Sequence, residues 1–369
     1  MDYDFYVYAV ALSHLFAYKC NVARGLVNFA GGPEKVFELS RRELEELLNG
    51  PSPFVDGIRD GATLEWARRE VEWDIANGVT PIYISEGRYP YRLRECPDAP
   101  LVLFCRGNAD LNPRQALAVV GTRRCTYCGR TSCTSIVGDL AKCVTPPVII
   151  SGLAYGIDAA AHTAALDAGL QTIAVSPVGA DTIYPLQHRR LAERIIENGA
   201  VVTDFCRNTA PVALTFVRRN RIIAGMADAT LLVESFAKGG GLITARHASS
   251  YDREVFALPG RTTDPSFQGC NSLIEQDIAH IATGATSITT VMGWIPPTLW
   301  EPQRTAISER EYDGNCKKVL SMLRRRSPMD LETMSGISGI GVRELSIAVL
   351  QLEFDGAIVN CIGNMYELA

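Results

Sequence analysis

The chain has 369 residues, 47% of them hydrophobic, which is enough for two or three domains with a substantial core. Acidic residues outnumber basic residues by 41 to 36, and the net charge of −5 excludes a protein that holds nucleic acid by its overall charge. The 11 cysteines lack the spacing of a disulfide framework, the first residues lack a basic leader, and no apolar run reaches the roughly 18 residues that cross a bilayer. We therefore expect a cytoplasmic protein with reduced thiols and no membrane partner.

Residues 1–65 are expected to form a helical module. Apolar spacing predicts helices at residues 6–18, 22–29, 33–39 and 41–48. Ser40 is followed three residues later by Glu43, the pattern of a capping box at a helix start. A connecting segment follows, with a predicted helix at 66–77 and predicted strands at 81–85 and 101–104.

From residue 116 the sequence alternates between apolar runs and helical segments. Strands are predicted at residues 116–120, 148–150, 172–175, 200–203, 230–233 and 254–257. Helices are predicted at residues 129–143, 159–168, 189–198, 216–226 and 242–251. Continuous apolar strands separated by helices are typical of a parallel sheet covered on both faces. The predicted fold class is a doubly wound α/β domain, with residues 66–295 assigned to it.

The composition changes after Trp294, where the Pro-rich residues 294–302 predict a linker. Helices are predicted at residues 317–324, 331–335 and 342–354. In the third helix, one apolar stripe is formed by Val342, Leu345, Val349 and Leu352. Residues 356–368 predict two short strands around Gly363 and Asn364. Three helices and a hairpin indicate a winged-helix domain at residues 305–369.

Glycine-rich or polar loops follow several predicted strands, and ligands of open parallel sheets lie outside the carboxyl ends of the strands. Candidate residues in these loops are Gly121, Thr122 and Arg123 after the first strand; Ser151, Gly152, Gly156 and Asp158 after the second; and Lys238, Gly239, Gly240, Gly241 and Thr244 after the fifth. Glycines let backbone N–H groups approach phosphate, and helix N-termini add a favourable partial charge. The loops together predict a groove that faces phosphate. For Asp158, the alternatives are the N-cap of the next helix, the fixing of its loop through neighbouring amides, and a hydrogen bond to a base; the cap or the loop is favoured because a carboxylate repels phosphate.

Arg218, Arg219, Asn220 and Arg221 form a basic cluster before an apolar helical run. The planar guanidinium suits phosphate because it donates two parallel hydrogen bonds. A solvated helix face is the alternative. We expect the cluster to lie at the head of a helix and to form one wall of the phosphate groove.

Several signatures of other functions are missing. The chain has neither a P-loop nor a dinucleotide-binding G-x-G-x-x-G in the first strand–helix turn, and no cofactor is expected. Cys125 and Cys128 lack a matching second pair, so no metal is expected. The loop after Gly241 lacks the catalytic Glu of α/β nucleoside monophosphate hydrolases, although a nucleotide-processing hydrolase stays open as the alternative. Aromatic residues near strand ends stack on bases or simply pack in the core: Tyr155, Tyr184, Phe205 and Phe236.

Taken together, these residues resemble the DNA-processing protein A (DprA/Smf) family. The matching motifs are residues 119–123 (VVGTR), 151–162 (SGLAYGIDAAAH), 184–185 (YP), 216–225 (FVRRNRIIAG), 240–245 (GGLITA), 259–260 (PG) and 269–274 (GCNSLI). Their order and spacing agree from about residue 66 to residue 284.

The resemblance implies an extended Rossmann-like domain that binds single-stranded DNA with little sequence preference. It also implies a non-catalytic homodimer that protects incoming DNA and helps to load the RecA recombinase in natural transformation. By position, phosphates would be held by Arg123, Arg218, Arg219 and Arg221. Ser151, Gly152, Gly156 and residues 239–244 would line the pocket. An adaptor that works mainly through its terminal domains is a further hypothesis, since Arg343 is offset by Glu344 and Glu353 on the third winged-helix helix.

Overall fold

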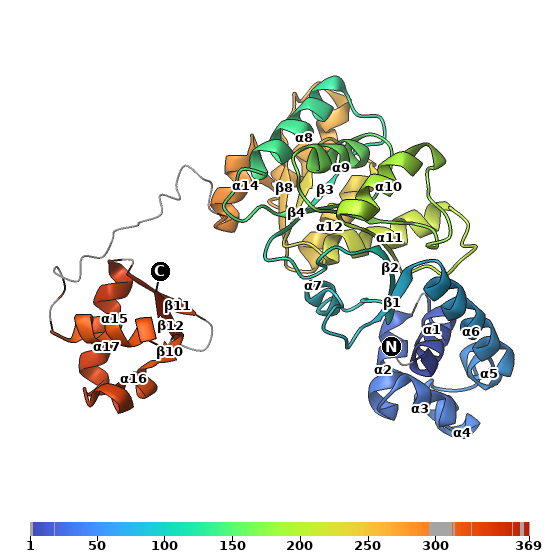
Figure 1. The fold of residues 1–369 in the computed structure, drawn as a ribbon. Helices are drawn as coiled ribbons and strands as arrows, with labels where there is room; N and C mark the ends of the chain where they lie inside the picture. Colours follow the sequence, from blue (N-terminus) through green and yellow to red (C-terminus); the bar gives the residue numbers. More distant parts are fainter. Residues whose placement is uncertain are drawn as a thin grey trace. The chain divides into compact units, whose positions relative to one another are not determined.

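The computed structural model describes residues 3–17, 19–294, 312, 314–325, 327–355, 357–361 and 365–368. The chain divides into two compact units, Met1–Pro296 and Pro297–Ala369 (Figure 1). The predicted linker lies outside the described residues, except for Trp294.

A nine-stranded sheet forms the centre of the described part of the first unit, in the order β1-β2-β6-β5-β4-β3-β7-β8-β9. Its strands are β1 (Val79–Tyr83), β2 (Val102–Gly107), β3 (Ala116–Val120), β4 (Val148–Ser151), β5 (Thr172–Val175), β6 (Ala200–Thr203), β7 (Ala229–Leu232), β8 (Glu254–Ala257) and β9 (His280–Ile281). Across the sheet, neighbouring strands pair in parallel from β6 through β5, β4, β3, β7 and β8 to β9. Strand β2 is antiparallel to both β1 and β6. The prediction of a mixed α/β fold with a mostly parallel sheet is confirmed.

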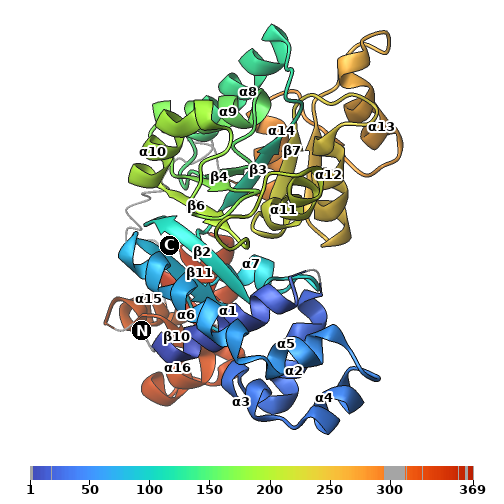
Figure 2. The same cartoon turned by 90° about the vertical axis from the view of Figure 1, so that its right-hand side faces the viewer.

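Helices cover both faces of the parallel strands. Figure 2 shows α8 (Tyr127–Leu140), α9 (Ile157–Asp167) and α10 (Arg189–Asn198) on one face, and α11 (Ala213–Gly225) and α12 (Gly240–Ser250) on the other. The short α7 (Tyr91–Arg94) contacts α11, α13 (Gln268–Glu275) contacts β8, and α14 (Ala285–Met292) contacts α8. Leu117, Ile149 and Leu231 are fully buried between these layers. This double burial is the reason that the strands are continuous apolar runs in the sequence.

Among the described residues before the sheet, the helices are α1 (Tyr3–Leu15), α2 (Cys20–Ala30), α3 (Pro33–Glu38), α4 (Arg41–Leu47), α5 (Pro53–Arg59) and α6 (Gly61–Ala76). The capping box at the start of α4 is confirmed: the Glu43 N–H donates to Ser40 Oγ at 3.3 Å, and the Ser40 N–H donates to Glu43 Oε2 at 2.7 Å. The sequence did not predict α5, and α6 runs across the predicted module boundary at residue 65.

The N-terminal helices share one apolar core with β1 and β2. Leu12 of α1 belongs to the same buried cluster as Tyr83 of β1 and Phe104 of β2. Figures 1 and 2 both show these two strands beside α1 and α6. The helices are therefore continuous in packing with the edge of the sheet, consistent with the single compact unit that ends at Pro296.

The second unit contains α15 (Gly314–Arg325), α16 (Leu331–Ser338) and α17 (Val342–Phe354). Its three-stranded antiparallel sheet has the order β10-β12-β11, with β10 (Met329–Asp330), β11 (Ile358–Cys361) and β12 (Met365–Leu368). The sequence did not predict β10, and the predicted turn at Gly363 and Asn364 lies outside the described residues.

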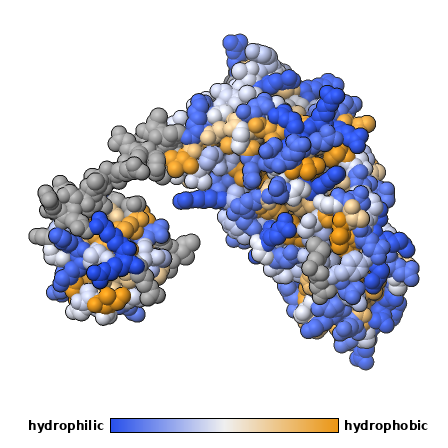
Figure 3. Space-filling model, viewed as in Figure 1, coloured by the Kyte–Doolittle hydropathy of each residue, from blue (hydrophilic) through white to orange (hydrophobic). Residues whose placement is uncertain are grey.

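Of the predicted stripe on α17, Leu345, Val349 and Leu352 are buried in the core of this unit, and Val342 is exposed. Three more apolar side chains of α17 are exposed: Ile347, Leu350 and Phe354. Figure 3 shows apolar residues on the surface of this unit. In the described part of the chain, no helix combines the length and the apolar character needed to span a membrane.

Candidate functional site

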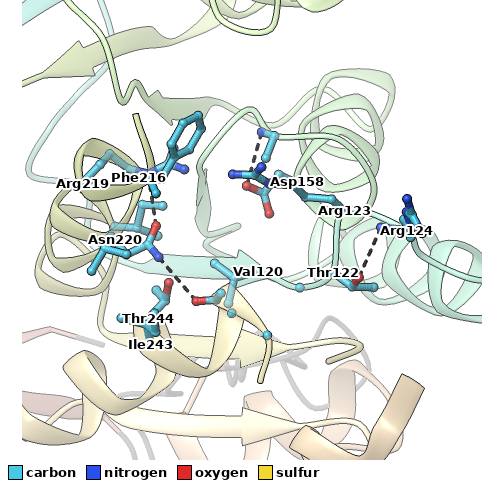
Figure 4. A pocket seen from close by; sticks show the side chains of 18 of the residues that line it. Val120, Thr122, Arg123, Arg124, Asp158, Phe216, Arg219, Asn220, Ile243 and Thr244 are labelled. Atoms are coloured by element: carbon cyan, nitrogen blue, oxygen red, sulfur yellow. Dashed lines mark hydrogen bonds between the residues drawn. The ribbon is translucent and has the colours of Figure 1, made fainter. Parts of the chain in front are cut away.

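A cavity of about 800 Å³ lies at the carboxyl ends of β3, β4 and β7. The strand order reverses here, because β4 lies on one side of β3 and β7 on the other. Such a switch point is where open α/β sheets bind ligands. We call this space the switch-point cavity (Figure 4). It is lined by Val120, Gly121, Thr122, Arg123, Arg124, Ala154, Asp158, Tyr184, Pro211, Ala213, Phe216, Val217, Arg219, Asn220, Ile223, Phe236, Gly239, Gly240, Gly241, Ile243 and Thr244.

The loop after β3 is held between two neighbouring elements. The Thr122 N–H donates to the Glu234 carbonyl oxygen at 2.8 Å, and the Ile157 N–H donates to the Thr122 carbonyl oxygen at 3.2 Å. A Cβ atom at Gly121 would lie 2.6 Å from Ile157 Cγ1, so only glycine fits this approach. The loop thereby positions Arg123, whose guanidinium carbon lies 4.6 Å from the centroid of the Phe216 ring.

The loop after β4 forms a second side of the cavity. Gly156 has a φ of +79°, and a Cβ atom there would lie 2.2 Å from the Thr122 carbonyl oxygen. Asp158 lies in the first turn of α9 and not at the N-cap, which is Gly156. Its Oδ2 accepts a hydrogen bond from the Ala154 N–H at 3.3 Å, so Asp158 fixes the loop, the second alternative for this residue. Burial raises the pKa of Asp158, and the nearby Arg219 charge opposes that rise.

The three arginines of α11 do not form one wall. Helix α11 begins at Ala213, so the arginines lie in its middle and not at its head. Only Arg219 lines the cavity. Arg218 Nη2 and Arg221 Nη2 both donate to Asp204 Oδ2, at 3.0 and 2.6 Å. The expectation that all three guanidiniums face the groove is therefore corrected, because Asp204 holds two of them elsewhere.

Arg219 is buried and tightly bonded. Its Nη1 donates to the Gly152 carbonyl oxygen at 2.5 Å and to the Val175 carbonyl oxygen, and its Nε donates to Asn220 Oδ1 at 3.2 Å. Asn220 Nδ2 in turn donates to the Gly240 carbonyl oxygen at 3.4 Å. Burial lowers the pKa of Arg219 to about 10, so it still carries its charge at neutral pH. This network fixes a positive charge in the cavity wall.

Helix α12 begins at the cavity with three glycines. Its N-cap residue, Gly239, supplies no side-chain cap, so the first N–H groups of the helix keep their capacity to bind an anion. A Cβ atom at Gly240 would meet nothing within 4 Å, whereas Gly241 lies against Gly121. Thr244, one turn further along α12, also lines the cavity.

The remaining predicted site residues lie outside this lining. Ser151 is buried, and its Oγ donates to the Val119 carbonyl oxygen at 2.6 Å. Gly152 lies against Arg219 of the cavity wall, Gly156 lines a neighbouring cavity, and Lys238 is exposed in the loop before α12.

Sequence reasoning missed several residues of the site. Phe216 and Arg124 line the cavity, and the Phe216 ring lies 5.4 Å from the Tyr184 ring between centroids. Glu234 is fully buried behind the loop after β3, where its carboxylate accepts hydrogen bonds from the Thr126 N–H and Oγ. Asp204 and Glu234 each come directly after a predicted apolar strand, at residues 200–203 and 230–233. An acidic residue at the carboxyl end of a strand was the signal in the sequence that could have marked them.

Charge in the cavity favours an anion. Its lining contains three arginines, Arg123, Arg124 and Arg219, and one carboxylate, Asp158. In contrast to Arg218 and Arg221, neither Arg123 nor Arg124 forms an ion pair with another described residue. A cavity that combines these arginines with the rings of Phe216 and Phe236 suits a ligand that carries both phosphates and flat rings.

A doubly wound α/β fold with a cationic, aromatic cavity at its switch point has the chemistry to hold a ligand that carries phosphates and rings. The chain belongs to the DNA recombination-mediator protein A family, whose model matches residues 80–293. The resemblance inferred from the sequence motifs is thereby confirmed.

The chain is 36% identical to DNA processing protein DprA of Streptococcus pneumoniae, over 68% of this chain and 89% of that relative. It is 42% identical to protein Smf of Escherichia coli, over 76% of this chain and 75% of the relative. Among solved structures, it is similar to DprA from Streptococcus pneumoniae, with a TM-score of 0.57 and 30% identity over 73% of this chain and 97% of that one. DNA processing protein A from Helicobacter pylori, whose structure concerns its single-stranded DNA binding mode, matches with a TM-score of 0.53 and 27% identity over 58% of this chain and 97% of that one.

Proposed function

We propose that the switch-point cavity binds single-stranded DNA, and that the protein protects incoming DNA and helps to load the RecA recombinase onto it in DNA-mediated transformation and recombination. The observation that carries the proposal is the pairing of Arg123 with the Phe216 ring opposite the uncapped start of α12. The single-stranded DNA binding mode of the Helicobacter pylori relative supports the same ligand class.

The cavity offers separate partners to the two parts of a nucleotide. Arg123, Arg124 and the first N–H groups of α12 suit phosphates, while Phe216 and Phe236 offer ring faces for stacking. Every base has a flat face, so stacking tolerates any sequence. We therefore expect binding with little sequence preference.

The cavity lining favours a binding function over hydrolysis. The carboxylate among its residues, Asp158, is buried, bonded to the Ala154 N–H and close to the Arg219 charge. A general base must instead reach the proton that it removes. We therefore propose a non-catalytic protein. Release of free base from nucleoside monophosphates, abolished by Asp158→Asn, would establish the alternative hydrolase.

The second unit has the elements of a winged-helix domain, and we assign it to contact with a protein partner. The outward side chains of α17 include Ile347, Leu350 and Phe354, which are apolar. A helix that reads a DNA groove needs basic and polar side chains at these positions. We propose that this unit serves RecA loading, and that the cytoplasmic protein acts as a homodimer.

Fluorescence anisotropy of a labelled oligothymidine across a salt series tests DNA binding at the cavity. The logarithm of the binding constant should fall with the logarithm of salt concentration, with a slope of about −0.7 for each phosphate contact. Arg123→Ala should weaken binding and make the slope shallower by about 0.7. Arg42→Ala is the matched control, because the Arg42 side chain is 89% exposed on α4. Binding that ignores both salt and Arg123→Ala would refute the proposed function.

A further inference from the structure

A second cavity, of about 680 Å³, lies between α8 and α9. We call it the α8/α9 groove, and its lining includes Arg130, Tyr155, Ala160, Ala164, Asp167 and His188. One loop separates it from the switch-point cavity. Ala154 and Asp158 line the switch-point cavity, whereas Tyr155 and Gly156 line the α8/α9 groove.

We propose that the α8/α9 groove binds the next nucleotides of the same DNA strand that occupies the switch-point cavity. The proposal rests on the function assigned above and extends its binding site across the loop at residues 154–158. A DNA strand is the proposed occupant because the groove lies next to the cationic switch-point cavity. Like that cavity, it presents the face of an aromatic ring and a guanidinium.

The ring face comes from Tyr155, which is 42% exposed. Its ring lies 4.9 Å from the His188 ring between centroids, at 67°, and its hydroxyl donates to Gln187 Oε1 at 2.7 Å. His188 Nδ1 lies 2.8 Å from the Leu153 carbonyl oxygen. These contacts hold both rings in place before any ligand arrives, which favours stacking of a base on the exposed side of Tyr155.

The groove has room and positive charge for a nucleotide. Ala160 and Ala164 form part of its floor, and their small side chains leave the space open. Arg130 forms no ion pair among the described residues, and its Nη2 donates only to Cys125 Sγ, a weak acceptor, at 3.9 Å in the described part of the chain. The carboxylate of Asp167 is compensated by Arg194, whose Nη2 lies 2.8 Å from Asp167 Oδ1. Arg130 is thus available for a phosphate.

The path between the two cavities is also basic. Figure 4 shows Arg123 beside Asp158, and Arg124 extending from the same loop away from Asp158. Arg124 lines the switch-point cavity, and Arg130 lies in the first turn of α8, the helix that follows this loop, and lines the α8/α9 groove. Each step along this path offers a guanidinium to a phosphate.

Binding of oligothymidines of different lengths, from about 4 to about 16 nucleotides, tests the groove in the full-length protein, because single-strand sites span this range. Tyr155→Ala should weaken binding of the long oligonucleotides about fivefold or more and leave the shortest ones unaffected. Tyr155→Phe keeps the ring and should bind like the wild type. Arg130→Ala should make the salt slope shallower by about 0.7 for long oligonucleotides alone.

Tyr91→Ala is the matched control, because Tyr91 is 44% exposed, on α7, and lines neither cavity. Photocrosslinking with iododeoxyuridine at successive positions gives a second readout, and a crosslink at Tyr155 from positions distant from the Phe216 crosslink is expected. If Tyr155→Ala and Arg130→Ala bind every length as Tyr91→Ala does, the groove is not part of the site, although the proposed function stands. If the wild type binds no length, both proposals fail.

Discussion

Gly152 and Arg219 approach each other so closely that any side chain at residue 152 would displace the Arg219 guanidinium. Arg219 Nη1 donates to the Gly152 carbonyl oxygen at 2.5 Å, and a Cβ atom on Gly152 would lie 2.3 Å from the same nitrogen. The fixed cation of the switch-point cavity thus depends on a residue that does not line it.

Gly152→Ala is expected to displace the Arg219 guanidinium from its two carbonyl acceptors. We expect the free energy of unfolding to fall by about 1–3 kcal/mol, because the added methyl overpacks a buried polar network. Affinity for single-stranded DNA should fall as well. Urea denaturation and anisotropy measure the two effects.

Gly240→Ala is the matched control for that substitution, since its Cβ atom would meet nothing within 4 Å. It should leave the free energy of unfolding unchanged or slightly higher, while the new methyl at the start of α12 hinders phosphate and lowers DNA affinity. Equal stability of Gly152→Ala and the wild type would contradict the role given to Gly152.

Arg221→Ala should act on folding and not primarily on DNA contact. Arg221 and Asp204 are both buried, and their ion pair has an Nη2–Oδ2 distance of 2.6 Å. Removal of one partner of a buried pair costs about 3–5 kcal/mol, although the remaining Arg218 contact should hold the loss near the lower value. Arg42→Ala, which removes an exposed pair with Glu46, should change stability by less than about 1 kcal/mol. Similar effects of the two substitutions on urea denaturation would refute this assignment.

Asp74 of α6 is expected to make stability fall as pH rises. Burial and the neighbouring Glu70 carboxylate raise the pKa of Asp74 to about 8, despite the nearby Arg207; Asp181 acts in the same direction as Glu70. Because the folded state holds this proton more tightly than the unfolded state does, the contribution is fully present below the unfolded value of 3.8 and is lost as pH rises through about 8. Within that window the loss reaches about 1.4 kcal/mol per pH unit.

Asp74→Asn should therefore reduce the difference in the free energy of unfolding between mildly acidic and mildly alkaline solution. Urea denaturation at several pH values measures it, with Asp4→Asn as the control, since the Asp4 side chain is 71% exposed. An unchanged pH profile in Asp74→Asn would show that Asp74 does not titrate in this range.

Removal of the second unit should separate DNA binding from delivery to RecA. All residues that line the switch-point cavity belong to the first unit, so deletion of residues 297–369 should leave the affinity for oligothymidine within about a factor of two or three. Loading of RecA onto DNA, measured by assembly of recombinase filaments, should fall sharply. A parallel loss of DNA affinity would assign DNA contact to the second unit.

The sequence predicted the parallel strands well because a strand buried on both faces is a continuous apolar run in the sequence. The predicted strand at 254–257 coincides with β8 (Glu254–Ala257), and the one at 230–233 is displaced by one residue from β7 (Ala229–Leu232). Glycine motifs likewise located the switch-point loops, because close backbone approaches such as that of Gly121 to Ile157 exclude other residues.

The directions of the arginine side chains were harder to predict. Residues three apart share a helix face, so Arg218 and Arg221 point the same way and Arg219 does not. The predicted helix at 216–226 already contained these residues, but its start was placed three residues after the observed start at Ala213, so the cluster was expected at the head of the helix. The counter-ion Asp204 lies 14 residues before Arg218, and nothing in the local sequence marks a contact at that separation. Which residues form an ion pair across such a distance in the sequence depends on how the folded chain brings them together.

The core shared by α1, β1 and β2 also bears on how such proteins can change over evolution. A substitution at Leu12 alters the space available to Phe104 of β2, so such positions should change in compensating pairs among relatives. The second unit has a buried cluster of its own, which includes Val319 and Leu345. Substitutions in that second core should accordingly be compensated by other residues of the same cluster, and the N-terminal helices should be inherited together with their sheet.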